Sequence, residues 1–100
     1  MNILITARKF KARQTLKDFI NSEVTSLKKY NDDILSADVK LSYLNSKDSV
    51  KSAEIILQVP GQILSATEET DEFEKSISSA VEKLSRQLKK LKTRKIQKVR

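Results

Sequence analysis

The stretch Phe73–Lys92, FEKSISSAVEKLSRQLKKLK, decides the fold of this chain. Its apolar residues recur mainly at steps of three and four positions, which is the spacing of one stripe along an α-helix. At about 100° per residue, the cationic residues fall on the opposite face or on its flank. The stripe is Phe73, Ile77, Ala80, Val81, Leu84, Leu88 and Leu91, and the cations are Lys75, Lys83, Arg86, Lys89 and Lys90. We therefore expect one buried face and one densely cationic face.

The two ends of this helix carry opposite charge. Acidic residues cluster at positions 68–74, where Thr70 or Asp71 can cap the first turn. From Lys83 to Arg100 there are nine Lys or Arg and no acidic residue. This polarity suits the helix macrodipole. We expect the outward cations to be free of carboxylates from the same chain, because only then are they available to a partner.

The positive charge is localised. The chain has 100 residues, with 20 Lys or Arg against 13 Asp or Glu, so its net charge is +7. Since nine cations lie in residues 83–100, the other eleven and the 13 acids give residues 1–82 a net charge of −2. A basic patch on a small protein indicates a polyanionic partner, a nucleic acid first and an anionic membrane second.

The elements that precede this helix follow from apolar spacing and turn residues. Alternation of apolar and polar residues predicts strands, and a second stripe with three-to-four spacing predicts a first helix. Pro60-Gly61 predicts a tight turn, because Pro fixes φ and Gly accepts positive φ. The expected strands are Asn2–Ala7, Ala37–Tyr43, Ala53–Val59 and Ile63–Thr67, the first helix runs from Gln14 or Thr15 to about Lys28–Asn31, and Asn45–Ser49 is a polar turn.

The order β-α-β-β-β-α predicts an α+β two-layer sandwich, in which both helices pack on one face of a four-stranded sheet. The last three strands should form an antiparallel meander, and the first should pair in parallel after its helical crossover. Tyr30, Ile34 and Leu35 are expected to close one end of the core. We predict a single domain over residues 1–92 and a frayed or disordered basic tail over residues 93–100, where the apolar stripe is lost.

Several kinds of chemistry are not expected. The chain has no Cys and no His, so the usual thiolate nucleophile and general base are missing. Residues 68–74 lack the spacing and the Gly of a calcium loop, and Gly61 in its turn cannot cradle a phosphate. We interpret the chain as a non-enzyme without metal, cofactor or small-molecule substrate. No apolar run approaches membrane-spanning length and no leader is visible, so a cytoplasmic location is expected.

A second group of cations, Arg8, Lys9, Lys11 and Arg13, follows the first strand. Either it is a solvated loop, or it is a second patch that contacts an anion beside the first helix. Lys28 and Lys29 fall in the last turn of that helix, where the macrodipole alone favours cations. Exposed aromatic residues are scarce, so base stacking on the sheet is disfavoured. Binding of a structured RNA through helix charge and shape fits the pattern better.

The residues also resemble a known family. Lys83–Lys90, KLSRQLKK, is similar to the second-helix signature of the short ribosome hibernation promoting factors, also named ribosome-associated inhibitors. Met1–Arg8, MNILITAR, is similar to the opening strand of that family. Thr15-Leu16 with Tyr30, and Val59-Pro60-Gly61, fall where the family has comparable residues. The resemblance covers nearly the whole chain in one register.

This resemblance implies a βαβββα fold close to that of double-stranded RNA-binding domains. It implies binding to the small ribosomal subunit and its rRNA, in the channel of messenger RNA and transfer RNA, so that translation is blocked and idle ribosomes hibernate under stress or in stationary phase. Lys83, Arg86 and Lys90 match rRNA-facing positions of the family, and Lys89 and Lys92 extend the same surface. The protein is expected to be monomeric off the ribosome.

Two other functions remain open at this point. A general double-stranded RNA-binding module would bind any RNA duplex with comparable affinity. A peripheral membrane protein would use the basic tail, but that tail lacks the apolar face that such helices need. The full set of expected rRNA-binding residues is Arg8, Lys9, Lys11, Arg13, Lys75, Lys83, Arg86, Lys89, Lys90 and Lys92.

Overall fold

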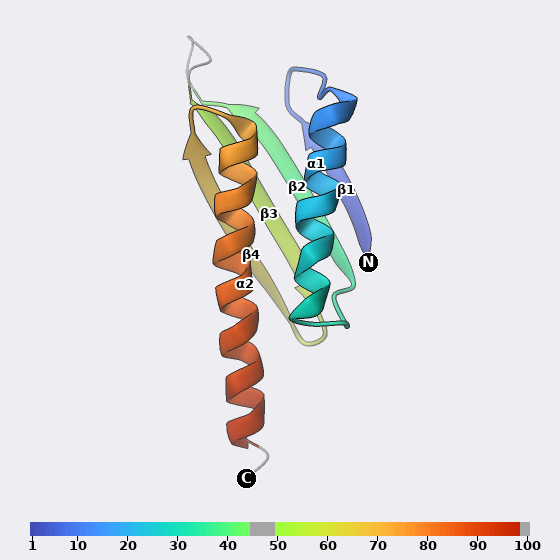
Figure 1. Ribbon diagram of the computed structural model, residues 1–100, viewed down its shortest axis with the longest axis vertical. Helices are drawn as coiled ribbons and strands as arrows, with labels where there is room; N and C mark the ends of the chain where they lie inside the picture. Colours follow the sequence, from blue (N-terminus) through green and yellow to red (C-terminus); the bar gives the residue numbers. More distant parts are fainter. Residues whose placement is uncertain (45–49, 99–100) are drawn as a thin grey trace.

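Strands and helices follow one another in the predicted order in the computed structural model (Figure 1), which describes residues 1–44 and 50–98, with side chains up to Leu91. The predicted turn at 45–49 lies outside the described residues. A short 3₁₀ helix, η1, continues the first helix. The elements are β1 (Asn2–Ala7), α1 (Gln14–Thr25), η1 (Ser26–Lys29), β2 (Ser36–Tyr43), β3 (Lys51–Val59), β4 (Gln62–Thr70) and α2 (Phe73–Lys98).

The four strands form one sheet in the order β1-β2-β3-β4. β1 pairs with β2 in parallel, whereas β2, β3 and β4 form an antiparallel meander. The register places Ile5 beside Val39, Val39 beside Ile55, and Ile55 beside Ala66. Gly61, with a φ of 86°, completes the two-residue turn between β3 and β4. The predicted fold class and strand directions are confirmed.

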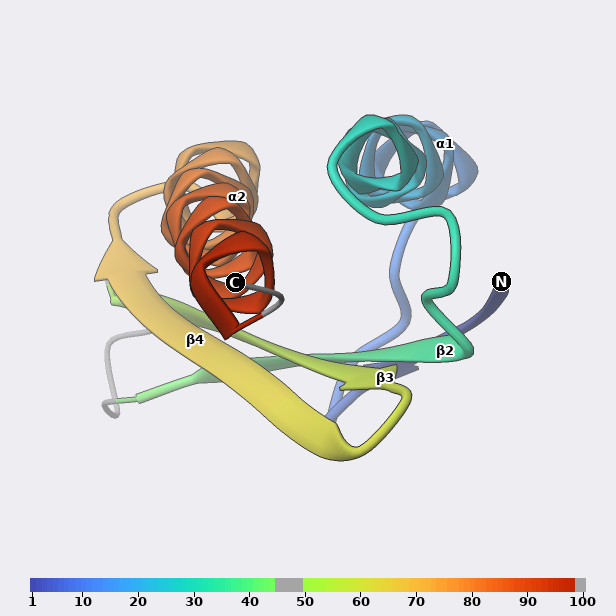
Figure 2. The same ribbon diagram turned by 90° about the horizontal axis from the view of Figure 1, so that it is seen from below.

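Both helices cover the same face of the sheet, and the opposite face is left open (Figure 2). The core lies between these layers, because alternate residues of each strand and one stripe of each helix point into it. Burying these side chains is the main driving force for folding. The buried core includes Ala37, Val39 and Leu41 of β2, Ala53, Ile55, Leu57 and Val59 of β3, Ile20 and Val24 of α1, Leu27 of η1, and Phe73, Ile77, Ala80, Val81, Leu84 and Leu88 of α2.

The acidic segment does not open the helix as expected, because β4 extends to Thr70 and contains Glu68 and Glu69. Thr70 does act at the start of α2: its hydroxyl accepts a hydrogen bond of 3.2 Å from the Glu72 amide. Buried Ser76 then ties the first turn to the sheet by donating a 2.7 Å hydrogen bond to the Lys51 carbonyl. The alternation of β4 therefore turns Glu68 toward α2 instead of placing it ahead of the helix.

The helical backbone of α2 continues to Lys98, beyond the residue where the apolar stripe stops, and the predicted fraying of the tail stays a prediction. Residues 93–98 contain no Gly or Pro, and Lys, Arg and Gln have favourable helix propensities. The helix therefore continues although its apolar stripe has stopped. This part of α2 projects beyond the sheet in Figure 1. Residues 99–100 of the predicted tail lie outside the described residues.

One residue of the expected core plug is misplaced. Ile34 is buried, and Tyr30 is half-buried against the core, as predicted. Leu35 is 54% exposed. Its amide donates to the Gln58 carbonyl at 2.8 Å, and its own carbonyl accepts from the Asn2 amide at 3.2 Å. These backbone bonds hold Leu35 in the end of the sheet, where its side chain stays in solvent.

Candidate nucleic-acid interface

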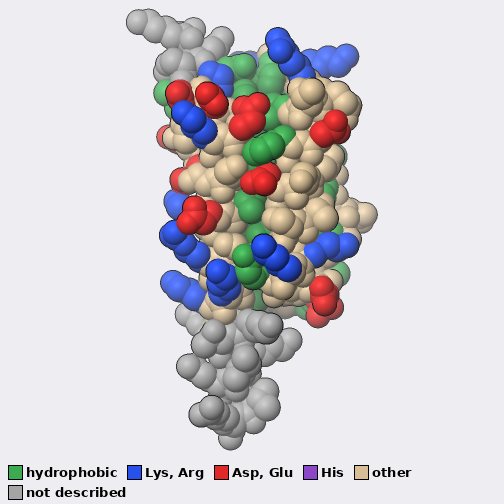
Figure 3. Space-filling model, in the orientation of Figure 1, with side chains coloured by type: hydrophobic (Ala, Val, Ile, Leu, Met, Phe, Trp, Pro, Cys, Tyr) green, Lys and Arg blue, Asp and Glu red, His purple; other side chains and the backbone are tan. Residues whose placement is uncertain are grey.

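The cations in the second half of α2 point away from the core. The buried stripe of this helix faces the sheet, and Lys83, Arg86, Lys89 and Lys90 are all exposed. Exposed Lys28 and Lys29 of η1 lie at the same end of the helical layer, since α1 and α2 run in the same direction (Figure 1). Figure 3 shows Lys and Arg gathered over this end, with acidic side chains more frequent at the other. We refer to Lys28, Lys29, Lys83, Arg86, Lys89 and Lys90 as the helix-end patch.

Two members of the helix-end patch are paired with carboxylates, contrary to the expectation from sequence. Lys83 forms an ion pair of 2.5 Å with Glu68 of β4, and Arg86 forms one of 2.6 Å with Glu82 on the preceding turn. The Lys83 side chain nevertheless keeps 53% of its surface exposed and that of Arg86 67%. Exposed ion pairs contribute only about 0–1 kcal/mol, so the Arg86–Glu82 pair, which is exposed on both sides, costs little to open.

Glu68 is the better-held of these two carboxylates. It receives the Lys83 ammonium and also a 2.6 Å hydrogen bond from the Ser79 hydroxyl. The hydrogen bond from Lys83, followed by that from Ser79, lowers the pKa of Glu68 below its usual value. Both donors favour the charged form, so Glu68 is ionised at neutral pH and anchors Lys83 against β4.

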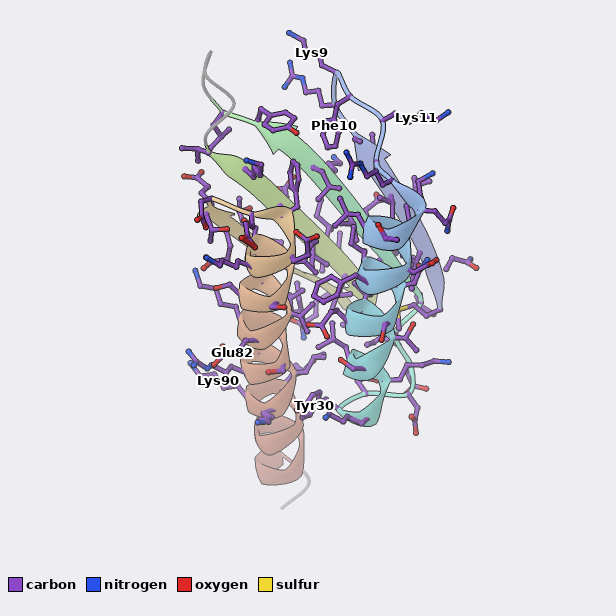
Figure 4. All side chains as sticks on the ribbon, turned by 45° about the horizontal axis from the view of Figure 1, so that its top comes forward. Lys9, Phe10, Lys11, Tyr30, Glu82 and Lys90 are labelled. Carbon is purple, nitrogen blue, oxygen red and sulfur yellow. The ribbon has the colours of Figure 1, made fainter. Side chains whose placement is uncertain are left out.

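The remaining described cations of α2 have different surroundings. The Lys89 ammonium lies 5.1 Å from the centre of the Tyr30 ring, and the Lys29 ammonium lies 5.3 Å from the same centre. Lys90 projects from α2 on the side away from α1 (Figure 4) and forms no ion pair with the described residues. The side chain of Lys92 lies outside the described part of the chain, so its predicted role stays a prediction.

Lys75 does not belong to the helix-end patch. It lies near the first turn of α2, where it forms a 3.2 Å ion pair with Asp71. The hydrogen bond from Lys75 lowers the pKa of Asp71, and the same contact raises the pKa of Lys75. Glu72 and Glu74 are close neighbours in the sequence. Its surroundings are therefore acidic, and the structure separates Lys75 from the other predicted cations of the helix.

The cations after β1 form a second patch at the opposite end of the molecule. Lys9 and Lys11 project from the loop in Figure 4, and Arg8 and Arg13 are exposed as well. No member of this group forms an ion pair with the residues that the structure describes. We refer to Arg8, Lys9, Lys11 and Arg13 as the loop patch.

Phe10 anchors the loop patch to the core. Its ring stacks on Phe73 with centres 5.1 Å apart and meets Tyr43 edge-on at 5.0 Å. Ala12 is also buried, and Lys9 adopts a left-handed φ of 64°, so the chain turns sharply while its cations stay outside. Arg8 lines a shallow hollow of about 380 Å³ on the open face of the sheet together with Lys40 and Ser52. The packing of Phe10 and Ala12 therefore fixes the loop patch against the core, at the opposite end of the molecule from the helix-end patch.

Comparison with known proteins identifies the family. A family model described as sigma 54 modulation protein / S30EA ribosomal protein matches residues 3–96. The chain belongs to this family. It is 28% identical over 92 residues to a ribosome hibernation promotion factor of Deinococcus radiodurans, a match that covers 90% of this chain and 48% of that protein. The chain therefore spans about half the length of this curated relative.

Solved structures of similar proteins have the same fold. The N-terminal domain of Thermus thermophilus Protein Y is 28% identical, with a TM-score of 0.81 over 91% of this chain and 99% of that domain. A ribosomal subunit interface protein from Coxiella burnetii, 22% identical, superposes with a TM-score of 0.84 over 93% of this chain and 99% of that chain. These structures confirm the predicted βαβββα arrangement, and the family match confirms the resemblance seen in the sequence.

Within this S30EA chain, sequence reasoning missed the pair that flanks Tyr30. From sequence, the helix dipole is enough to explain Lys29, and the spacing of Tyr30 predicts a place at the end of the core. No local spacing signals the approach of Lys89, because it reaches Tyr30 only through the packing of η1 against α2. Among the described residues, no group of acidic side chains is arranged to hold a metal ion. The described helices include none that is both long and apolar enough to span a bilayer.

Proposed function

We propose that this S30EA-family protein binds the rRNA of the small ribosomal subunit, occupies the channel of messenger RNA and transfer RNA, and so inhibits translation and keeps idle ribosomes in hibernation. The observation that carries this proposal is the helix-end patch: cations of α2 and η1 stand together at one end of a helical layer whose other side is the core. The family match and the hibernation factor of Deinococcus radiodurans support it.

The physical basis is counterion release. Each Lys or Arg that neutralises a phosphate frees a condensed ion, so several together give strong affinity that falls steeply with salt. Such contacts position the protein but do not recognise a base sequence. They therefore suit binding at one fixed site on the ribosome better than selection among RNA sequences. The shape of the helical layer would then select the channel over other RNA surfaces.

We further propose that the protein works in the cytoplasm as a monomer that meets the ribosome directly. It needs no catalytic group, metal or cofactor for this role, because occupancy of the channel is itself the inhibition. The expected binding residues are the cations of the helix-end patch, Lys92 and the loop patch. Lys75 contributes least, since it lies among acids at the other end of α2.

The test is sucrose-gradient sedimentation of small subunits with the purified protein. Changing Lys83, Arg86, Lys89 and Lys90 to Glu together should abolish co-sedimentation, and added messenger RNA should displace the unmodified protein. A smaller variant, Lys89→Glu with Lys90→Glu, has a matched control in Lys17→Glu with Lys40→Glu, which changes net charge equally outside both patches. Unaltered co-sedimentation of the fourfold variant would refute the proposal.

The alternative is a general double-stranded RNA-binding module. It predicts that a random RNA duplex competes with small subunits on equal terms, and that messenger RNA does not compete selectively. The proposed function predicts that a duplex at the same phosphate concentration leaves most of the protein on the subunit. Competition sedimentation with both RNAs separates the two functions directly.

A further inference from the structure

Tyr30 occupies a junction between two elements. It follows η1 directly, it is half-buried against the core, and its ring lies beside α2 (Figure 4). Two ammonium groups approach this one ring from different elements: Lys29 of η1 at 5.3 Å from the ring centre and Lys89 of α2 at 5.1 Å. Both distances fall within the range of a cation–π contact.

This arrangement gathers like charges. Two ammonium groups that both lie within 5.3 Å of one ring centre repel each other, and each could reduce that repulsion by turning into solvent. The electron-rich face of the tyrosine ring offsets part of the repulsion and limits the rotamers of both lysines. Lys29 also forms no ion pair with any described residue, so its charge is available for an anion.

We propose that Lys29 and Lys89 form a clamp for the phosphodiester backbone of RNA, and that Tyr30 is the positioning residue that holds their ammonium groups beside each other. The clamp rests on the proposed function, because it names the part of the RNA that this corner of the helix-end patch contacts. A phosphate that contacts both ammonium groups meets them already oriented by the ring, so little side-chain entropy is lost on binding.

The clamp differs from a general basic surface in one measurable way. On a general surface, each lysine contributes independently of Tyr30. In the clamp, removing the ring weakens the contribution of both lysines, so the effects of the substitutions are not additive. Lys28 is the matched control, because it shares the 3₁₀ helix and the charge of Lys29 but makes no cation–π contact with Tyr30.

The experiment is a set of double-mutant cycles on the affinity of the full chain for small subunits and, separately, for polyuridylate as a phosphodiester probe. Tyr30→Leu should weaken binding about two- to five-fold, the size of an exposed cation–π contact. Tyr30→Phe, which keeps the ring, should bind like the unmodified protein. Lys29→Ala and Lys89→Ala should each lose most of their effect in the Tyr30→Leu background, whereas Lys28→Ala should keep its effect in full.

Thermal unfolding of each variant ensures that affinity is compared between folded proteins. The clamp is overturned if Tyr30→Leu binds polyuridylate like the unmodified protein, or if its effect simply adds to those of Lys29→Ala and Lys89→Ala. Coupling on polyuridylate without any binding to small subunits supports the clamp and refutes the proposed function. Binding to small subunits without coupling on either RNA leaves the proposed function and overturns the clamp.

Discussion

Glu68 lies on the helix-facing side of β4, where its carboxylate receives both the Lys83 ammonium and the Ser79 hydroxyl. At the residue scale, this contact sets how Lys83 is presented to a partner. The ammonium is held on the flank of α2 instead of sampling solvent in every direction. A residue that opposes phosphate binding by its charge therefore also orients one of the cations that would bind phosphate.

Replacing Glu68 by Gln should reveal this contact through the pH dependence of stability. The folded state lowers the pKa of Glu68, so the carboxylate stabilises the fold above its unfolded pKa and loses that contribution as pH falls through the folded pKa. Glu68→Gln should cost about 1 kcal/mol at pH 7, or about 4–8 °C in Tm. The difference from the unmodified protein should vanish in acid. A Tm difference that is equal at pH 7 and in acid would contradict this assignment.

Glu82 offers a cleaner way to alter binding alone. Its ion pair with Arg86 is exposed on both sides and contributes little to stability. Glu82→Gln should leave Tm within about 2 °C and tighten binding to small subunits by a few-fold, because Arg86 no longer leaves a carboxylate and a negative charge is removed. Glu74→Gln, the same change at the far end of α2, is the control and should alter affinity less. Equal gains from both substitutions would point to net charge instead of position.

At this scale the sequence is informative only for local contacts. The Glu82–Arg86 pair could have been predicted from its spacing of four along a helix. The pairing of Lys83 with Glu68 and the approach of Lys89 to Tyr30 could not, because they depend on which strand and which turn lie beside α2. The cations themselves and the partner of Arg86 were therefore predictable, whereas the partners of Lys83 and Lys89 were not.

At the scale of elements, periodicity predicted nearly everything. β1 was predicted with its observed bounds, and α1 began at one of the two expected residues. The strand β4 is longer than predicted because Glu68 and Thr70 continue the alternation that faces α2, although they are polar. The helical backbone of α2 continues past the apolar stripe because helical propensity persists where the stripe stops. Apolar periodicity shows which residues are buried. It gives the bounds of a helix or strand only where the whole element is buried.

The division of α2 into two faces gives a direct prediction from neighbouring residues. Leu84 is fully buried, whereas Lys83 is largely exposed. Leu84→Ala should lower the free energy of unfolding by about 2–5 kcal/mol through lost apolar contact and a cavity. Lys83→Ala should lower it by at most about 1 kcal/mol, since it removes one partly exposed ion pair. Urea denaturation of both variants measures the contrast, and similar losses would show that α2 is not packed as described.

At the scale of the whole molecule, the cations divide between two ends. The helix-end patch lies where α1 ends and α2 runs beyond the sheet, and the loop patch lies where both helices begin (Figures 1 and 4). The sequence separates the cations that follow the first strand from those of the second helix, but it does not show how far apart they lie, because charge counts along a chain carry no information about distance across a fold. Only the sheet topology places residues 8–13 beside the start of α2.

This separation predicts how the two patches act together. Arg8, Lys9, Lys11 and Arg13 changed to Ala together should weaken subunit binding and lower the slope of log affinity against log salt, by roughly 0.7–0.9 for each phosphate contact that is lost. Because the patches are far apart, their free-energy losses should add in a combined variant with Lys89→Ala and Lys90→Ala. Titrations at several salt concentrations measure both quantities. An unchanged slope would identify the loop patch as a solvated loop.

The internal ion pairs of α2 have a further consequence for selectivity. Lys83 and Arg86 are already paired with carboxylates of the same chain. A single isolated phosphate that displaced one of these carboxylates would therefore gain little binding free energy. Displacement becomes favourable only where several phosphates are fixed close together, as on a folded RNA surface. If the protein binds RNA as proposed, Glu68 and Glu82 would lower its affinity for isolated phosphates, and they would pair with Lys83 and Arg86 again when the protein dissociates.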